Sequence, residues 1–107
     1  MYAILATTGY QVSENSFPEE FNSLTFPYIT YEQDYTDNFF ADGKVYQKVQ
    51  NYVVYLHMDG RRLNRAVQKT LEDVMDANDL LWEESDAYYD EDESHFIVEY
   101  EVGEWRS

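Results

Sequence analysis

The spacing of apolar residues along the chain predicts four strands. Aromatic and β-branched residues fill 26–32, the long stretch 44–58 is partly apolar on both faces, as in a central strand, and apolar residues alternate with acidic ones towards the end of 95–102. An alternation with a period of two is typical of a strand with one buried face. Residues 83–89 are predicted as the remaining strand, joined to the last one by a charged turn at 90–94.

Between the second and third strands the period of the pattern changes from two to 3.6. Apolar residues recur along 61–78 in a stripe that is typical of an amphipathic helix, and Asp59, just before Gly60, is a candidate N-cap. Residues 1–8 are long enough for two further turns of helix. The stripe of the long helix consists of Leu63, Ala66, Val67, Thr70, Leu71, Val74 and Met75.

These elements predict an α+β fold. The order is α-β-β-α-β-β, with 9–25 and 34–43 as irregular connections and 103–107 as a tail. A helix with one apolar stripe must bury it against another layer, which here is a sheet. We therefore expect a mostly antiparallel sheet of about four strands with one amphipathic helix packed on one face. The 107 residues are expected to form a single domain, 1–107.

The charge of the chain excludes some classes of partner. There are 22 acidic and 7 basic residues, which gives a net charge of −15. Binding to nucleic acid or to an anionic membrane needs many lysines and arginines, so we expect neither. No apolar run is long enough for a membrane span, and the first residues lack the basic and apolar regions of a signal peptide.

The sequence offers little that points to catalysis or to metal binding. His57 and His95 lie at strand ends and could approach each other, but a zinc site would need two further ligands. The acidic run at 83–93 lacks the spacing of a calcium loop. Nucleophile, phosphate-loop and zinc-protease motifs are missing too, and the chain has no cysteine. We predict a protein that is not an enzyme and that has no cofactor and no metal site.

Three groups of residues are candidates for an interface between subunits. Phe39 and Phe40 are adjacent in a predicted connection, where one could enter the core or both could form an exposed apolar loop. Four of the seven basic residues fall between Arg61 and Lys69, although such a group can also be an ordinary solvated face. The acidic turn has no cation nearby in the sequence. The candidate residues are Phe39, Phe40, Arg61, Arg62, Arg65, Asp90, Glu91, Asp92 and Glu93.

Several segments resemble a known family. They are Phe-Pro-Tyr-Ile-Thr-Tyr at 26–31, Asp-Asn-Phe-Phe-Ala-Asp-Gly-Lys-Val-Tyr-Gln-Lys-Val at 37–49, Tyr-Val-Val-Tyr-Leu at 52–56, Trp-Glu-Glu-Ser-Asp-Ala-Tyr-Tyr-Asp at 82–90 and Phe-Ile-Val-Glu-Tyr-Glu-Val at 96–102. This arrangement resembles the tail-completion, or tail-terminator, proteins of long-tailed bacteriophages. The likeness covers about 26–102 and consists of strand and aromatic positions.

The resemblance implies a structural role in the virion. Proteins of this family have a small α+β fold and assemble as rings, often hexamers, that cap the tail tube and join it to the head. The expected partners are therefore further copies of the chain, the tail tube and the connector proteins, and the expected location is the head–tail junction. The family has no catalytic residues to carry over. An acidic ring around a DNA channel would let DNA pass without binding.

Two other functions are compatible with the composition. An acidic inhibitor that imitates DNA, and so blocks a host nucleic-acid enzyme, also needs many carboxylates. A small binding adaptor with no role in a phage is the third alternative. The DNA mimic predicts acidic residues spaced along an elongated surface and no self-assembly beyond a dimer.

Overall fold

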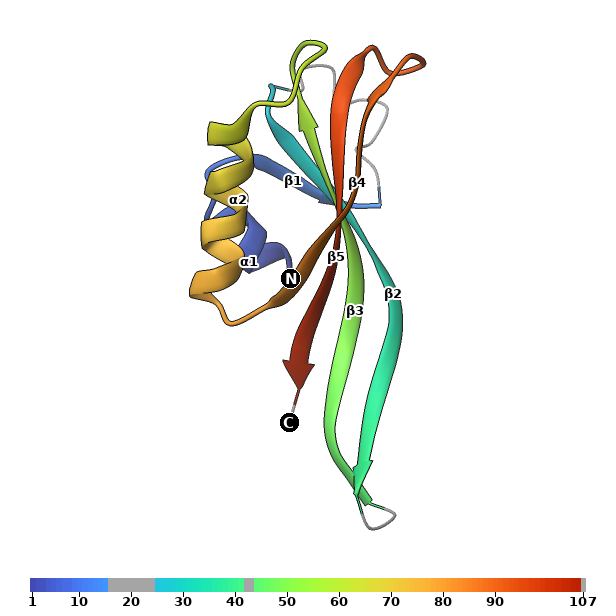
Figure 1. The fold of residues 1–107 in the computed structure, drawn as a ribbon. Helices are drawn as coiled ribbons and strands as arrows, with labels where there is room; N and C mark the ends of the chain where they lie inside the picture. Colours follow the sequence, from blue (N-terminus) through green and yellow to red (C-terminus); the bar gives the residue numbers. More distant parts are fainter. Residues whose placement is uncertain (16–24, 42–43, 107) are drawn as a thin grey trace.

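The computed structural model describes residues 1–15, 25–41 and 44–106, and over 35–48 and 105–106 it describes the backbone alone. Within these residues the fold is α+β, as predicted, with two helices and five strands. Figure 1 shows the elements in chain order: α1 (Tyr2–Ala6), β1 (Gln11–Glu14), β2 (Tyr28–Ala41), β3 (Lys44–Met58), α2 (Arg65–Ala77), β4 (Leu81–Asp90) and β5 (His95–Arg106).

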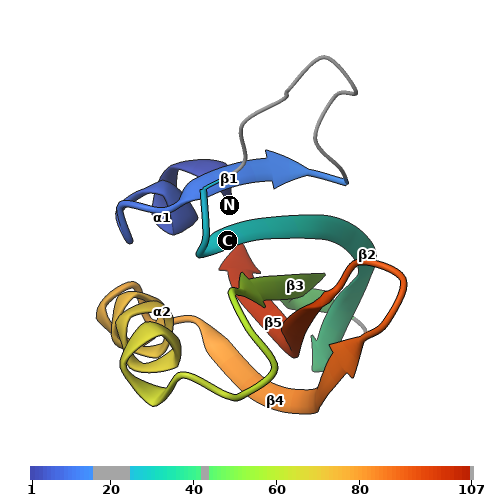
Figure 2. The ribbon, with the colours of Figure 1, turned by 90° about the horizontal axis from the view of Figure 1, so that it is seen from above.

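The strands form one mixed sheet in the order β1-β2-β3-β5-β4. β1 pairs with β2 in parallel, and every other pair is antiparallel. β3 therefore lies in the middle of the sheet, and the last strand, β5, is inserted between β3 and the edge strand β4. The sheet is strongly curled, and both helices lie on the same side of it (Figure 2).

Three predictions about the strands were wrong in detail. β1 lies within 9–25, which were expected to be irregular, because four residues are too few to show a period of two. β2 continues to Ala41 through the expected connection at 34–43, where pairing with β3 outweighs the low strand propensity of aspartate and asparagine. The expected tail at 103–107 belongs to β5 up to Arg106.

The long helix begins later than predicted. Its N-cap is Asn64, whose side-chain oxygen accepts the backbone N–H groups of Ala66 and Val67 at 3.1 and 3.3 Å. Gly60 has a φ of +87°, so the chain turns sharply there, and Asp59 is not the cap. Leu63 consequently lies outside the helix and is 38% exposed.

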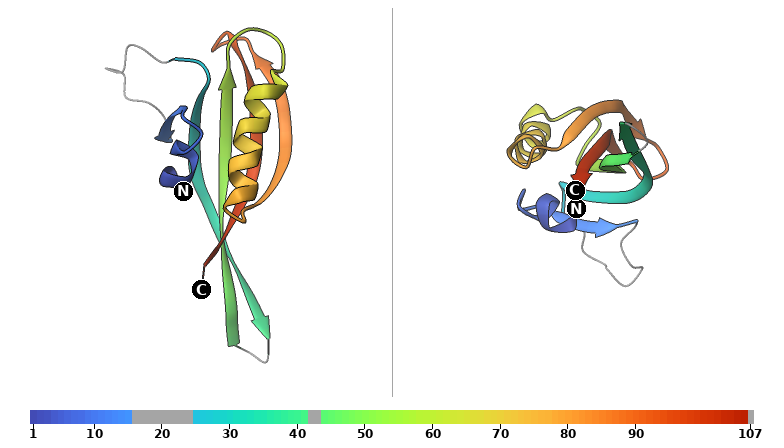
Figure 3. Two further views of the ribbon diagram at one scale, coloured as in Figure 1. Left: turned by 90° about the vertical axis from the view of Figure 1, so that its left-hand side faces the viewer. Right: turned by 90° about the horizontal axis from the view of Figure 1, so that it is seen from below.

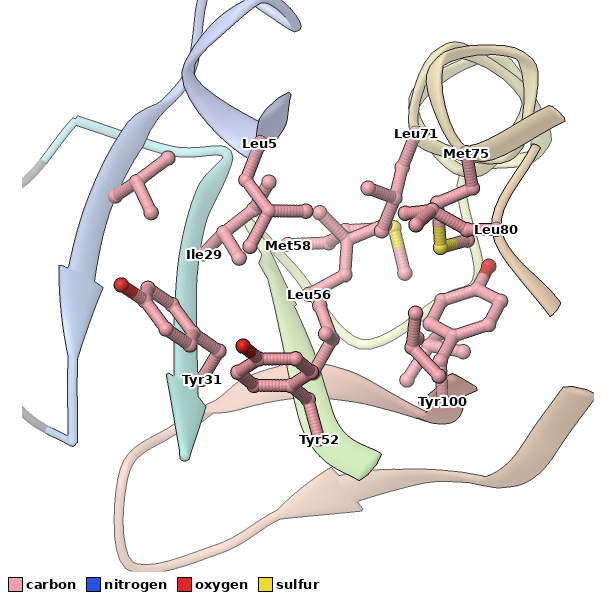
Figure 4. Packing of buried hydrophobic residues seen from close by; sticks show 14 residues of the cluster. Leu5, Ile29, Tyr31, Tyr52, Leu56, Met58, Leu71, Met75, Leu80 and Tyr100 are labelled. Carbon is pink, nitrogen blue, oxygen red and sulfur yellow. The ribbon is translucent and has the colours of Figure 1, made fainter. Parts of the chain in front are cut away.

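The core lies between the two helices and one face of the sheet. Leu71 and Met75 of α2 are fully buried against the strands, and Leu5 anchors α1 in the same cluster (Figure 4). The helix also buries Gln68, a polar residue outside the predicted stripe. Its amide donates to the Glu84 carboxylate on β4 and accepts from Arg65 at 2.7 Å, so its polar groups remain paired.

The hairpin of β2 and β3 extends well beyond the rest of the sheet. β1 pairs with β2 only as far as Tyr31, and β5 pairs with β3 only from Lys48 onward. The segments 32–41 and 44–47 therefore have no other described strand on their outer edges, and we call the projecting part of this hairpin, residues 34–41 and 44–47, the arm. It accounts for the elongated shape of 50 × 29 × 24 Å (Figures 1 and 3).

Candidate functional site

The structure places the predicted basic and acidic groups at the same end of the molecule. The loop that carries Arg61 and the β4–β5 turn lie side by side (Figure 1). The guanidinium of Arg61 lies 4.8 Å from the ring centre of Tyr89, the residue before the turn. Arg65 donates to Gln68, and Arg62 is exposed in the loop. Arg61 and Arg65 therefore each have a partner within the chain, and their part in an interface between subunits stays a prediction.

The acidic turn is held by its own first residue. The Asp90 carboxylate accepts the backbone N–H groups of Asp92 and Glu93 at 2.9 and 3.1 Å. This is a common use of aspartate at the start of a turn. Glu91, Asp92 and Glu93 are exposed. Asp90 therefore has a structural role in the turn, while the other three acidic residues of the turn are exposed.

Phe39 and Phe40 belong to β2, in the arm, and not to a connection. The register of the hairpin is irregular between them, since Phe39 pairs with Gln47 and Phe40 with Val45. Such an irregularity twists and bends a strand. The side chains of both phenylalanines lie outside what the structure describes.

A groove lies on the face of the sheet opposite the helices. It has a volume of about 490 Å³, and residues of β2, β3, β4 and β5 line it. Tyrosines and carboxylates dominate the lining: Tyr28, Tyr55, Tyr88, Glu32, Asp90 and Glu93. The sequence prediction placed none of the tyrosines in a site, although Tyr55 and His57 share the second face of the strand at 44–58, which could have identified it.

The tyrosine hydroxyls in this groove are tied to carboxylates. Tyr55 donates to Glu32 at 2.7 Å, and burial together with this bond raises the pKa of Tyr55 well above its usual range. Burial and a hydrogen bond to Glu99 raise the pKa of Tyr88 to about 12. Burial and the charge of Glu93 raise the pKa of Tyr28. The three phenols therefore remain protonated and neutral at physiological pH.

Two pairs of acidic residues face each other beside the groove. Glu83 is directly opposite Glu101, and Asp86 is directly opposite Glu99, across the β4–β5 ladder. Like charges at directly opposite positions destabilise a sheet. This side of the sheet is therefore strongly negative at some cost to the stability of the fold.

A chain of hydrogen bonds runs along the floor of the groove. The Thr30 hydroxyl oxygen lies 2.8 Å from Nε2 of His57, and Nδ1 of His57 lies 2.8 Å from Nε2 of His95. Nδ1 of His95 lies 3.0 Å from the carbonyl oxygen of Glu93. The prediction that the two histidines could approach each other is confirmed, and Thr30 is a partner that the sequence did not indicate.

The carbonyl at the end of this chain fixes the direction of every bond. A carbonyl oxygen only accepts, so Nδ1 of His95 carries a hydrogen. In the neutral pair, Nε2 of His95 then accepts from Nδ1 of His57, and Nε2 of His57 accepts from Thr30. Burial, with a contribution from His95, lowers the pKa of His57 to about 4, so its ring is neutral at physiological pH.

All four ring nitrogens are used in this chain, which leaves none for a metal. Among the described residues no group of three or more histidines, aspartates or glutamates is placed to hold a metal ion. Tyr28 stacks on the His57 ring, with centres 4.3 Å apart and planes 11° from parallel. The histidine pair therefore supports the position of the tyrosine.

Comparison with known proteins adds no family. The chain matches no protein-family model and has no significant match among curated proteins. In the portion of the chain that the structure covers, neither helix is long and apolar enough to cross a membrane.

Proposed function

We propose that this protein is a structural component of a phage virion that assembles as a ring, caps the tail tube and joins it to the head. The observation that carries the proposal is the arm. Its two strands pair with each other but with no other described strand along their outer edges. A feature of this kind is typical of a protein that completes its structure with a neighbouring molecule.

The outer edges of the arm carry backbone groups that no described strand pairs. An isolated two-stranded hairpin is marginally stable in water, and unpaired strand edges readily pair with another chain. Another copy of the same protein that lies against the arm would satisfy these groups. A contact between the arm of one copy and the body of the next joins two different surfaces, and such contacts close into a ring when the rotation permits.

The net charge of −15 suits a ring that surrounds DNA. Acidic walls repel the phosphates, so that DNA passes without being held. In this role the protein needs no catalytic group, no cofactor and no direct contact with DNA. Its partners are its own copies, a hexamer being the expected ring, together with the tail tube and the connector proteins. It acts at the head–tail junction of the virion after assembly in the host cytoplasm.

A shortened arm tests the proposal. Asn38 lies opposite Lys48 in the hairpin. Deletion of 39–41 and 44–47 therefore leaves these two paired residues joined by Asp42-Gly43, a sequence that suits a two-residue turn. We expect the unaltered protein to form rings that electron microscopy detects at high concentration, and the shortened protein to remain monomeric. Circular dichroism and urea unfolding check that the shortened protein folds, because its core residues are all retained.

A second variant distinguishes the contribution of strand pairing to ring assembly from the contribution of the aromatic side chains of the arm. Phe39→Thr with Phe40→Thr keeps two residues of high strand propensity and removes both rings. Loss of rings in this variant assigns the contact to the phenylalanines, and their retention assigns it to strand pairing. Normal assembly of the shortened protein would show that the arm is not the interface, and a monomer at every concentration and on tails would contradict the ring itself.

The alternative function, an acidic inhibitor that imitates DNA, is favoured by one observation. The like-charged pairs Glu83–Glu101 and Asp86–Glu99 place carboxylates in two rows on one face of the sheet. A basic nucleic-acid enzyme could bind such a face in place of DNA. Inhibition of a host nuclease or polymerase by a purified monomer would favour this function over the ring.

A further inference from the structure

The groove opposite the helices is lined mainly by carboxylates and aromatic rings, together with Asn15, Thr30 and Ile97. The lining that bears charge consists of Glu32, Asp90 and Glu93, and the lining contains no lysine or arginine. His57 adds no positive charge, because it is neutral. A ligand that matches this lining has to be a cation.

The tyrosines of the groove indicate which kind of cation fits it. The hydroxyl of Tyr55 is already donated to Glu32, and that of Tyr88 is bonded to Glu99, so each ring meets a ligand through its π face. An arginine guanidinium stacks on tyrosine rings and forms paired hydrogen bonds with a carboxylate. A lysine ammonium is a compact, strongly hydrated charge that fits such a flat, aromatic site less well.

The like-charged pairs give an independent reason to expect a cation here. Asp86 and Glu99 face each other next to Tyr88, and their repulsion destabilises the unbound sheet. A positive charge held between these groups and the groove would remove that repulsion. The described carboxylates do not converge into a metal site, so an organic cation fits better than a metal ion.

We propose that this groove binds an arginine side chain presented by a basic segment of a partner protein. The partner is defined by charge complementarity: the groove, of about 490 Å³, has room for a guanidinium and its alkyl stem and has carboxylates at its margin. The site is formed by the body of the sheet and not by the arm. The proposed arginine site can therefore be tested independently of the proposed ring.

The test uses a short peptide of three arginines with blocked ends, and peptides of three lysines and three glutamates for comparison. Titration into the full-length, isotope-labelled protein is followed by NMR. We expect the amide signals around Tyr55, Tyr88 and Ile97 to shift with tri-arginine, about fivefold weaker binding with tri-lysine, and no shift with tri-glutamate. Equal binding of tri-arginine and tri-lysine would overturn the guanidinium site and leave a general acidic surface.

Matched variants locate the binding. Glu32→Gln removes one charge from the groove, and Glu91→Gln removes one from the exposed turn, which lies outside it. The first should weaken tri-arginine binding about fivefold, and the second should change it less than about twofold. Tyr88→Phe should retain binding and Tyr88→Leu should weaken it, because only the second removes a ring. If Tyr88→Leu does not fold, the comparison of Glu32→Gln with Glu91→Gln tests the site by itself. Equal losses of tri-arginine binding in these two variants would overturn the proposal.

Discussion

His57 is held neutral by its surroundings, and this has a consequence for stability. Its ring is covered by Tyr28, and both nitrogens are bonded within the fold. Protonation would convert the nitrogen that accepts from Thr30 into a donor, so the Thr30 hydroxyl would have to reorient, and the positive charge would be buried next to His95. The pKa of about 4 in the folded protein compares with 6.5 for an unburied histidine.

Stability should therefore fall with acidification between these two values. The unfolded chain binds a proton on His57 first, so the contribution of this residue is complete above about pH 6.5 and is lost as the pH falls through about 4. It amounts to about 3 kcal/mol at most. Urea unfolding of the natural protein and of His57→Gln, in steps from about pH 7.5 to 5, measures it as a difference. Parallel profiles for the two proteins would contradict the assignment.

Gly103 is fixed by close packing in the middle of the sheet. It lies between Asn51 of β3 and Leu81 of β4, and a Cβ atom at this position would be 2.8 Å from a methyl carbon of Val49. We expect Gly103→Ala to destabilise the fold by about 1–3 kcal/mol. Val49→Ala should relieve the clash, so the double variant should lose less than the sum of the single losses. Additive losses in thermal unfolding would show that the two sites do not touch.

At the scale of the elements, α2 is attached to the sheet by fewer residues than its sequence pattern suggests. Leu71 and Met75 are fully buried, whereas Leu63, a member of the predicted stripe, is 38% exposed and precedes the helix. Leu71→Ala should therefore lower the free energy of unfolding by about 2–5 kcal/mol. The same substitution at Leu63 should cost less than about 1 kcal/mol. Equal costs in urea unfolding would mean that the helix packs as the simple periodicity predicts.

The sequence predicted correctly those parts of the fold in which apolar residues follow a recognisable strand or helix pattern. The strands at 44–58 and 95–102 and the end of α2 were found in this way. Gln68 was missed because a buried amide breaks an apolar stripe, and its partner Glu84 comes from a distant strand. The groove was missed because its tyrosines come from three strands whose order in the sheet no local pattern records.

At the scale of the whole molecule, the excess of acidic residues governs what the surface repels. Lys69 forms an ion pair with Asp73, at 2.8 Å on the exposed side of α2. The remaining carboxylates leave a strong negative field around the molecule. We expect no binding to duplex DNA at about 150 mM salt, as measured by fluorescence anisotropy. Micromolar binding that weakens steeply with added salt would contradict this.

The insertion of β5 between β3 and β4 determines when the sheet can be completed during synthesis. β3 and β4 do not pair with each other, and both require residues 95–106 between them. The ribosome must therefore make almost all of the described chain before the two halves of the sheet can join. Until then α2 has only part of the surface that buries it, and the nascent chain is open to proteases and chaperones. Any contact that requires the complete sheet is therefore delayed until almost all of the described chain has been made.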